Sequence, residues 1–208
     1  MFPTFFRTVI WISTLALGAT LACPAVGAGE YNPALKIGDA APAWKDLPGV
    51  DGEKHSLDDL KDKPVVVVVF TCNSCPIATD YEDRIIAVAK QRADKVALVA
   101  INVNRIAEDS LPKMQERAKS KEFPFAYLSD ESQQIAKDYG ATFTPEFFVL
   151  SRDRKIVYMG GMDDSSDPAA VKHNYLEPAI VAALAGELPA TKETVARGCR
   201  IRYARSRK

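Results

Sequence analysis

The sequence has few residues that bind metals and no excess of either charge. It contains two histidines and four cysteines among 208 residues, and Lys+Arg and Asp+Glu are both 27. This balanced charge gives no reason to expect a nucleic acid or an acidic substrate as a partner. A phosphate-binding loop, a nucleotide fingerprint, a catalytic Ser-His-Asp pattern and internal repeats are all missing from the sequence. We therefore expect no cofactor and no resident metal.

The composition is that of an ordinary globular protein. Hydrophobic residues make up 47% of the chain and charged residues 26%, which excludes a disordered or collagen-like protein. The length suits one well-buried domain with short appendages.

Residues 1–28 have the pattern of a secretory signal rather than of a folded segment. One charge, Arg7, precedes the apolar run VIWISTLALGATLA, and small residues stand at Val26 and Ala28. This order predicts a signal peptide cleaved after Ala28, because the run is short for a membrane span of about 20 residues. We therefore expect an exported protein, periplasmic or extracellular. An uncleaved anchor is the alternative.

A second feature of this segment is the run TLAC, which ends at Cys23. It resembles a bacterial lipoprotein box, although Thr20 is a poor match to the first position of that box. Lipidation at Cys23 would attach the protein to a membrane through its N-terminus. With cleavage at Ala28 instead, three cysteines remain: Cys72, Cys75 and Cys199. Disulfides persist outside the cytoplasm, and this odd number leaves one cysteine without an obvious partner.

The remaining chain alternates between predicted strands and helices. An extended lead-in over 30–46 and a hairpin around Gly49 and Gly52 come first. Strands are predicted at 65–70, 95–104, 125–130, 144–150 and 155–161. Helices are predicted at 75–92, 110–121, 132–140 and 167–186, where Asp167 is the cap and Pro168 the first residue. Such alternation implies an α/β fold with a parallel pair at the centre of its sheet and helices on both faces.

The chemistry of this chain depends on Cys72 and Cys75, which follow the valine-rich run 65–70. Haem attachment requires a histidine directly after the second cysteine, and that residue is Pro76. A structural zinc site requires four ligands, and the chain offers only His55, His173 and Cys199, each far away in sequence. A structural disulfide would close a very small loop and remove little entropy from the unfolded chain. Thiol–disulfide exchange remains.

Exchange has a physical basis at the junction of a strand and a helix. The amides of a first helical turn carry partial positive charge, which we expect to favour a thiolate at Cys72. Cys72, as the outer cysteine, would attack a substrate disulfide. Cys75 would then attack the mixed disulfide and release the reduced product. Pro76 falls in the first turn, where its missing N–H costs little.

The segments FTCNSCP (70–76) and ATFTPEFFVL (141–150) resemble the thioredoxin-like superfamily. The resemblance implies a cis peptide bond between Thr144 and Pro145, and a substrate groove that these two residues line. The groove would also include the neighbours of the cysteine pair: Thr71, Asn73, Ser74 and Pro76. The lead-in from residue 36 and the segment 104–128 are similar to the redoxin branch, the alkyl hydroperoxide reductase/thiol-specific antioxidant group. The implied domain covers 36–187, with an N-terminal hairpin extension, a central mixed sheet and a basic tail at 188–208.

The sequence departs from this family in ways that affect the chemistry. Thioredoxins carry Trp where this chain has Thr71, and a buried Asp in the strand before the pair, where residues 65–69 are all valine. Proton transfer from Cys75 must then use water or another group. The dipeptide Asn73-Ser74 matches no familiar one, so the direction of electron transfer stays open.

Three other readings remain for the cysteine pair. A thiol peroxidase of the redoxin group would use Cys72, but it needs a Thr three residues earlier, where this chain has Val69; the required Arg is present as Arg84. A copper(I) carrier would use both cysteines with His173, since thiolates suit soft copper. An interaction module would keep a vestigial pair that is never reduced.

Cys199 could be a third redox cysteine. It lies between Arg197 and Arg200, and positive neighbours lower the pKa of a thiol. A tail cysteine that only packs on the fold is the alternative. The expected partners are a disulfide- or thiol-bearing extracytoplasmic protein and an electron donor or acceptor that the sequence does not identify.

Overall fold

The computed structural model describes Met1 and residues 28–204. Cys23, Thr20 and most of the predicted signal segment lie outside the described residues. Within the described part of the chain, no helix is both long enough and apolar enough to span a bilayer.

The centre of the fold is a mixed sheet of five strands in the order β5-β4-β3-β7-β8. The strands are β3 (Val65–Thr71), β4 (Val96–Asn102), β5 (Ala126–Ser129), β7 (Glu146–Leu150) and β8 (Ile156–Gly160). β3 pairs with β4, and β4 with β5, in parallel, whereas β7 runs antiparallel to both β3 and β8. The predicted α/β class and central mixed sheet are confirmed.

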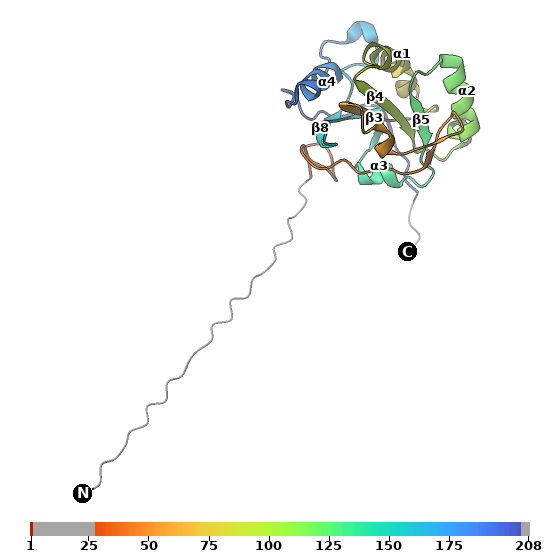
Figure 1. The fold of residues 1–208 in the computed structure, drawn as a ribbon. Coiled ribbons are helices and arrows are strands. Elements are labelled where there is room, and N and C mark those ends of the chain that lie inside the picture. Colours follow the sequence, from red (N-terminus) through yellow and green to blue (C-terminus); the bar gives the residue numbers. More distant parts are fainter. Residues whose placement is uncertain (2–27, 205–208) are drawn as a thin grey trace.

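Helices cover both faces of this sheet (Figure 1). Side chains alternate between the two faces of a strand, so Val65, Val67 and Val69 join one buried cluster and Val66, Val68 and Phe70 join the other. The first cluster includes residues of α1 (Pro76–Gln91), α2 (Leu111–Lys121) and α4 (Leu176–Ala185). The second contains residues of α3 (Gln134–Asp138) and of the N-terminal lead-in, among them Trp44. Burial on both faces explains why β3 is an unbroken apolar run.

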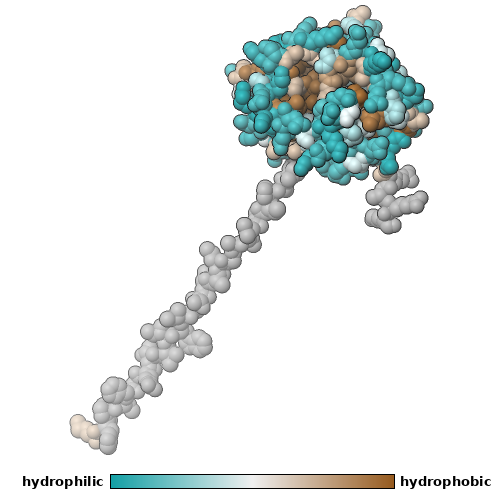
Figure 2. All heavy atoms as spheres, turned by 45° about the vertical axis from the view of Figure 1, so that its right-hand side comes forward, coloured by the Kyte–Doolittle hydropathy of each residue, from teal (hydrophilic) through white to brown (hydrophobic). Residues whose placement is uncertain are grey.

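The short elements lie around this core. The predicted hairpin is β1 (Leu47–Pro48) paired antiparallel with β2 (Lys54–His55). Three 3-10 turns follow: η1 (Leu57–Leu60), η2 (Ala107–Asp109) and η3 (Pro168–Ala170). Figure 2 shows that one face of the molecule is mostly hydrophilic and that its hydrophobic residues gather in a central area.

The predicted helix at 167–186 is wrong over its first half. Asp167 does cap a turn, since its side chain accepts the backbone N–H of Ala169, but η3 ends at Ala170. The carboxylate of Asp164 then accepts the backbone N–H groups of Lys172 and His173. These bonds close a loop, so α4 begins only at Leu176; it ends at Ala185, with Gly186 as the expected cap. His173 therefore lies in a loop and not in a helix.

The C-terminal segment packs along the fold, although its sequence has no periodicity. Met159 and Glu193 form an isolated bridge, and the Thr194 N–H donates to the carbonyl of Met159. Further on, β9 (Cys199–Arg200) pairs antiparallel with β6 (Phe143–Thr144). The end of the chain thus lies beside the residues that precede β7.

We predict that truncation of Phe148 strongly destabilises the fold. Its ring packs on Phe70 and Tyr139, with centroids 5.7 and 5.1 Å away, and it is fully buried. Phe148→Ala should lower the free energy of unfolding by about 3–5 kcal/mol, measured by urea denaturation followed by circular dichroism. Val181→Ala in α4, where Val181 is 50% exposed, is the control and should change it by no more than about 0.5 kcal/mol. Equal effects of the two changes would contradict this packing.

Candidate active site

Cys72 and Cys75 lie where β3 ends and α1 begins, as the sequence predicts. Both are free thiols and both are buried, with 2% and 1% of their surface exposed. Cys75 is the N-cap of α1, and its Sγ accepts the backbone N–H of Ala78 at 3.4 Å. The expectation that helical amides point at Cys72 is therefore corrected. The capping position belongs to Cys75, so Cys75 receives the amide.

Thr144 contacts both thiols. Its Oγ1 lies 3.4 Å from the Cys72 Sγ, and its carbonyl accepts the Cys75 S–H at 3.2 Å. The Thr144–Pro145 bond is cis, which confirms the family expectation. However, Thr144 is 1% exposed and Pro145 is buried as well. These two residues face the cysteine pair without lining an open groove.

Cys199 reaches the same place through the C-terminal segment. In the β6–β9 pair, Cys199 is the direct partner of Thr144. Its side chain packs against the cluster of Cys72, Cys75 and Ala78. The structure therefore brings together three thiols that lie as far apart as residues 72 and 199 in the sequence.

Asp109 is a buried acid beside the cysteine pair, whereas the strand residues 65–69 before the pair are all valine. It is 2% exposed and lies at the end of η2. One of its oxygens accepts the backbone N–H groups of Asn73 and Ser74 at 2.7 and 3.2 Å, and the other accepts the Ser74 hydroxyl at 2.5 Å. All three partners are donors and a carboxylate offers only acceptor oxygens, so the two sides match. Asp109 thereby fixes the dipeptide between the two cysteines.

Two buried side chains on neighbouring parallel strands support this dipeptide: Tyr127 in β5 and Asn102 in β4. The hydroxyl of Tyr127 in β5 donates to the Asn73 side-chain oxygen at 3.0 Å. The Asn102 amide, at the end of β4, donates to the Tyr127 oxygen and to Asp109, at 3.2 Å in both cases. Sequence reasoning missed all three residues. For Asn102, the last residue of the buried strand β4, the signal is that the carboxyl ends of parallel strands meet at one edge of the sheet. Asp109 in η2 and Tyr127 near the start of β5 have no such signal.

The other predicted groove residues have different surroundings. Thr71 is the buried last residue of β3 and, with Phe123 and Tyr127, lines a small closed cavity beside Cys72. Pro76 is exposed at the first position of α1. Asn73 lies at an open cleft of about 480 Å³ between η2, α2 and the cysteine loop.

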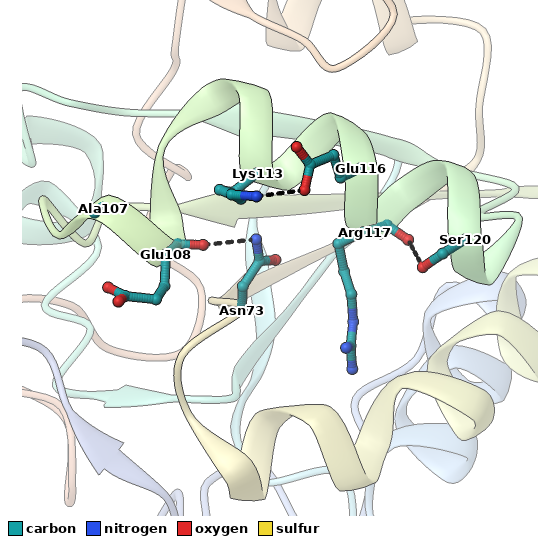
Figure 3. Close-up of a pocket in the computed structure, with 7 residues that line it drawn as sticks. All are labelled: Asn73, Ala107, Glu108, Lys113, Glu116, Arg117 and Ser120. Atoms are coloured by element: carbon teal, nitrogen blue, oxygen red, sulfur yellow. Dashed lines mark hydrogen bonds and ion pairs between the residues drawn. The ribbon is translucent and has the colours of Figure 1, made fainter.

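Figure 3 shows how this cleft is built. The Asn73 amide donates to the carbonyl of Glu108 at 3.0 Å, and the Lys113–Glu116 ion pair crosses the α2 side. The Arg117 side chain points from α2 toward α1, where it binds the largely buried carboxylate of Glu82. The cleft borders the loop between the cysteines at Asn73, and neither Cys72 nor Cys75 lines it.

The pKa values of Cys72 and Cys75 depend on each other. When one proton leaves, the Cys72 thiol donates to the Cys75 sulfur and holds the pKa of Cys75 down at about 4, against the opposing effect of burial. The same bond, with burial and the charge of Asp109, raises the pKa of Cys72 far above its ordinary value. Both effects favour the thiolate at Cys75, the opposite of the sequence expectation of a Cys72 thiolate.

Cys199 also departs from its expected acidity. Its interaction with Cys75 and its burial raise the pKa of the Cys199 thiol to about 11. Arg197 and Arg200 are exposed and do not offset this, although the charge of Arg202 lowers it slightly. The basic neighbours do not activate Cys199 while Cys75 holds the negative charge.

Two residues of the alternative readings lie away from the thiols in this fold. Arg84 binds the carboxylate of Asp163 and the carbonyls of Ser165 and Ser166. His173 is exposed in the loop before α4. Among residues 28–204, no three His, Cys, Asp or Glu side chains form a group that could hold a metal ion.

The sequence matches a known protein family. The model of the AhpC/TSA family matches residues 37–159. Over 122 residues the chain is 29% identical to Peroxiredoxin Bcp of Escherichia coli K12, covering 59% of this chain and 74% of that protein.

Solved structures include similar proteins as well. A hypothetical protein from Sinorhizobium meliloti 1021 has a TM-score of 0.77 at 32% identity, covering 84% of this chain and 98% of that one. An uncharacterized conserved protein from Geobacillus kaustophilus has a TM-score of 0.78 at 33% identity, covering 85% and 96%. The fold alone is shared with a thiol:disulfide interchange protein of the thioredoxin family from Chlorobium tepidum TLS, at 21% identity, a TM-score of 0.53 and coverages of 62% and 89%.

We predict that the reduced protein carries a thiolate in mildly acidic solution. Because the pKa of Cys75 is lowered to about 4, its thiolate should be present above that pH and lost below it, as measured by absorbance near 240 nm. Cys72→Ala removes the donor and should raise this midpoint. Cys72→Ser keeps a hydroxyl donor and should raise it less. A thiolate signal that arises only near the ordinary cysteine value of about 8.5 would contradict this coupling.

We also predict that Asp109 suppresses ionisation of Cys72. In a Cys75→Ser background, Cys72 titrates without its thiol partner, and Asp109→Asn should lower its pKa because a negative charge is removed while the side-chain shape is kept. The measurement is the pH dependence of the alkylation rate. Glu108→Gln, which neutralises the adjacent exposed acid, is the control and should leave the midpoint nearly unchanged. An equal shift in both variants would mean that the effect is not local to Asp109.

Proposed function

Because this chain belongs to the AhpC/TSA family, and its two thiols lie at a strand–helix junction, we propose that it is a thiol–disulfide oxidoreductase. The observation that carries the proposal is the pair of buried free thiols at the start of α1, both in contact with Thr144 before the cis proline. A thiolate is the nucleophile in disulfide exchange, and a neighbouring thiol is the group that resolves the mixed disulfide. Family membership establishes a redox protein with a thioredoxin-like fold, and the pair suggests this reaction.

The reaction moves two electrons between the pair and a substrate disulfide. The thiolate attacks one sulfur of the substrate, the substrate S–S bond breaks, and its other sulfur leaves as a thiolate that takes up a proton. The second cysteine of the pair then attacks the mixed disulfide, so that Cys72 and Cys75 become joined and the substrate is fully reduced. The same steps in reverse oxidise a dithiol substrate.

The substrate class we propose is a protein outside the cytoplasm. The support is the signal-like segment 1–28, together with a redox environment in which disulfides persist. An extended polypeptide suits the site because strand β6 lies beside both thiols and is covered by only a two-residue pairing with β9.

Peroxide reduction is the second candidate. Its support is the 29% identity to Peroxiredoxin Bcp. Two observations weigh against it: Val69 stands where the peroxidase pattern needs Thr, and Arg84 is bound to Asp163 instead of a thiol. With Arg84 held by Asp163, its positive charge does not polarise a peroxide bond at the Cys72 sulfur.

The test is a redox titration of the purified full-length chain in dithiothreitol and glutathione buffers, read by alkylation and mass spectrometry. We expect a reversible two-electron Cys72–Cys75 couple and thiol-dependent reduction of a test disulfide such as insulin. Cys72→Ser and Cys75→Ser should each abolish turnover, since one-cysteine variants stop at the mixed disulfide. The variant that accumulates this mixed disulfide retains the attacking sulfur.

Hydrogen peroxide consumption under the same conditions separates the two candidates. The oxidoreductase should reduce insulin much faster than it consumes peroxide. If the pair never joins at any potential and peroxide is consumed rapidly with Cys72 intact, the proposed reaction is overturned in favour of the peroxidase. Val181→Ala, a change at an exposed position of α4 that keeps both thiols, controls for general damage to the protein.

A further inference from the structure

The C-terminal segment occupies the strand edge at which an extended substrate would bind. β9 pairs antiparallel with β6, and Cys199 is the residue opposite Thr144. Addition of a strand to such an edge is a general mode of peptide recognition, in which backbone bonds give affinity and side chains give specificity. The protein's own chain therefore lies where a peptide would lie, with a cysteine at the position nearest the thiol pair.

We call residues 197–200 the strap, because the chain is held on both sides of them. Before the strap, Ala196 is buried and the Thr194 hydroxyl is bonded to the Tyr158 hydroxyl at 2.7 Å. After it, Ile201 is buried and its N–H donates to the Thr142 carbonyl at 3.0 Å, while the Tyr203 hydroxyl donates to the Ala141 carbonyl at 2.5 Å. The strap itself is fixed mainly by its two-residue pairing with β6.

Gly198 determines how closely the strap approaches. A Cβ at this residue would overlap the carbonyl oxygen of Thr144, so any other residue would push the strap away from β6. This is the same carbonyl that accepts the Cys75 S–H. The closeness of the strap to the Cys75 sulfur therefore depends on the missing side chain at Gly198.

We propose that Cys199 is a third reacting thiol, an inference that rests on the proposed function. Cys199 displaces Cys72 from the Cys72–Cys75 disulfide and forms a disulfide with Cys75. The Cys199 thiolate attacks the Cys75 sulfur, the Cys72–Cys75 bond breaks, and a Cys75–Cys199 bond forms. Cys72 leaves as a thiolate and takes the proton that Cys199 released. Neither an oxidant nor a reductant is consumed, because one disulfide replaces another.

Acidity supports the direction of this attack. In the reduced protein the charge on Cys75 and its bond to Cys199 keep Cys199 protonated. Once Cys75 is in a disulfide it carries no charge and offers no such bond. The two effects of Cys75 that raise the pKa of Cys199 then vanish, whereas the charge of Arg202 remains. Cys199 becomes a better nucleophile when its target has formed.

The product fixes the strap covalently across β6. Cys72 then carries a free thiol, and the edge of β6 is closed to any extended partner. The site would thus have two oxidised forms: the Cys72–Cys75 form, in which the strap is held by hydrogen bonds and packing alone, and the Cys75–Cys199 form, in which it is held by a bond. Reduction of the second form would release the strap and restore the pair.

The test maps disulfides in the full-length chain carrying Cys23→Ser, which leaves three thiols. The protein is equilibrated in glutathione buffers of graded potential, quenched in acid, alkylated and digested with trypsin. Cys72 and Cys75 fall on one peptide, whereas Cys199 falls on a separate peptide between Arg197 and Arg200. A linkage between these two peptides therefore reports Cys199 directly. We expect this linkage in the three-thiol protein and a larger fraction of it in Cys72→Ser, where no competitor for Cys75 remains.

Cys75→Ser is the matched control and should reduce the linkage to background, because Cys199 packs against the sulfur of Cys75. If Cys72→Ser gives no linkage while the three-thiol protein still shows a reversible Cys72–Cys75 couple, this inference fails and the proposed function stands. If the linkage forms but no Cys72–Cys75 couple is ever seen, the proposed function fails instead. A linkage that persists in Cys75→Ser assigns the exchange to Cys72 and also overturns the inference.

Gly198→Ala tests the role of the strap without removing a thiol. The added methyl group should push the strap from β6, speed alkylation of the Cys72–Cys75 pair and lower the fraction of Cys75–Cys199 linkage. Ala196→Gly, at a neighbouring position outside the strap, controls for loosening of the segment. Unchanged alkylation and linkage in Gly198→Ala would show that the strap does not govern access to the thiols.

Discussion

The antiparallel pairing of β3 with β7 is the constraint on which the whole site depends. Its register joins Phe70 to Glu146, and continuing it by two residues brings Cys72 opposite Thr144. The second pairing, β6 with β9, then places Cys199 opposite the same threonine. Both registers are set by buried strands and backbone bonds, so three distant thiols meet without any local sequence signal that joins them.

The chemistry follows from how little water this arrangement leaves around the sulfurs. Burial disfavours a thiolate on either member of the pair, and the S–H bond between them compensates at Cys75 alone. Asp109 adds a negative charge on the Cys72 side while anchoring Asn73 and Ser74 with its oxygens. A single carboxylate therefore both holds the loop in shape and disfavours a thiolate at Cys72.

The sequence alone predicts the parts of the structure that have strong periodicity or strict chemistry. The valine run, the helix that follows the cysteine pair and the hairpin at β1–β2 have local signals, the cis bond at Thr144 is implied by the family resemblance, and all are confirmed. Asp109 has none, because an acid in a polar segment looks like many others until β4 and η2 bring it to the loop. The delayed start of α4 also depends on a distant effect, the two backbone N–H groups that Asp164 accepts. The β9 pairing involves two residues, too few for any pattern.

One consequence of the strap concerns the order in which the molecule is made. Synthesis proceeds from the N-terminus, and every strand of the central sheet lies before residue 161. Residues 197–200 follow all of these strands in the chain, so the sheet and the Cys72–Cys75 pair can assemble before their cover exists. The nascent protein thus passes through a stage in which its two most reactive atoms are open to the surroundings. Pairing of β9 with β6 then closes the site.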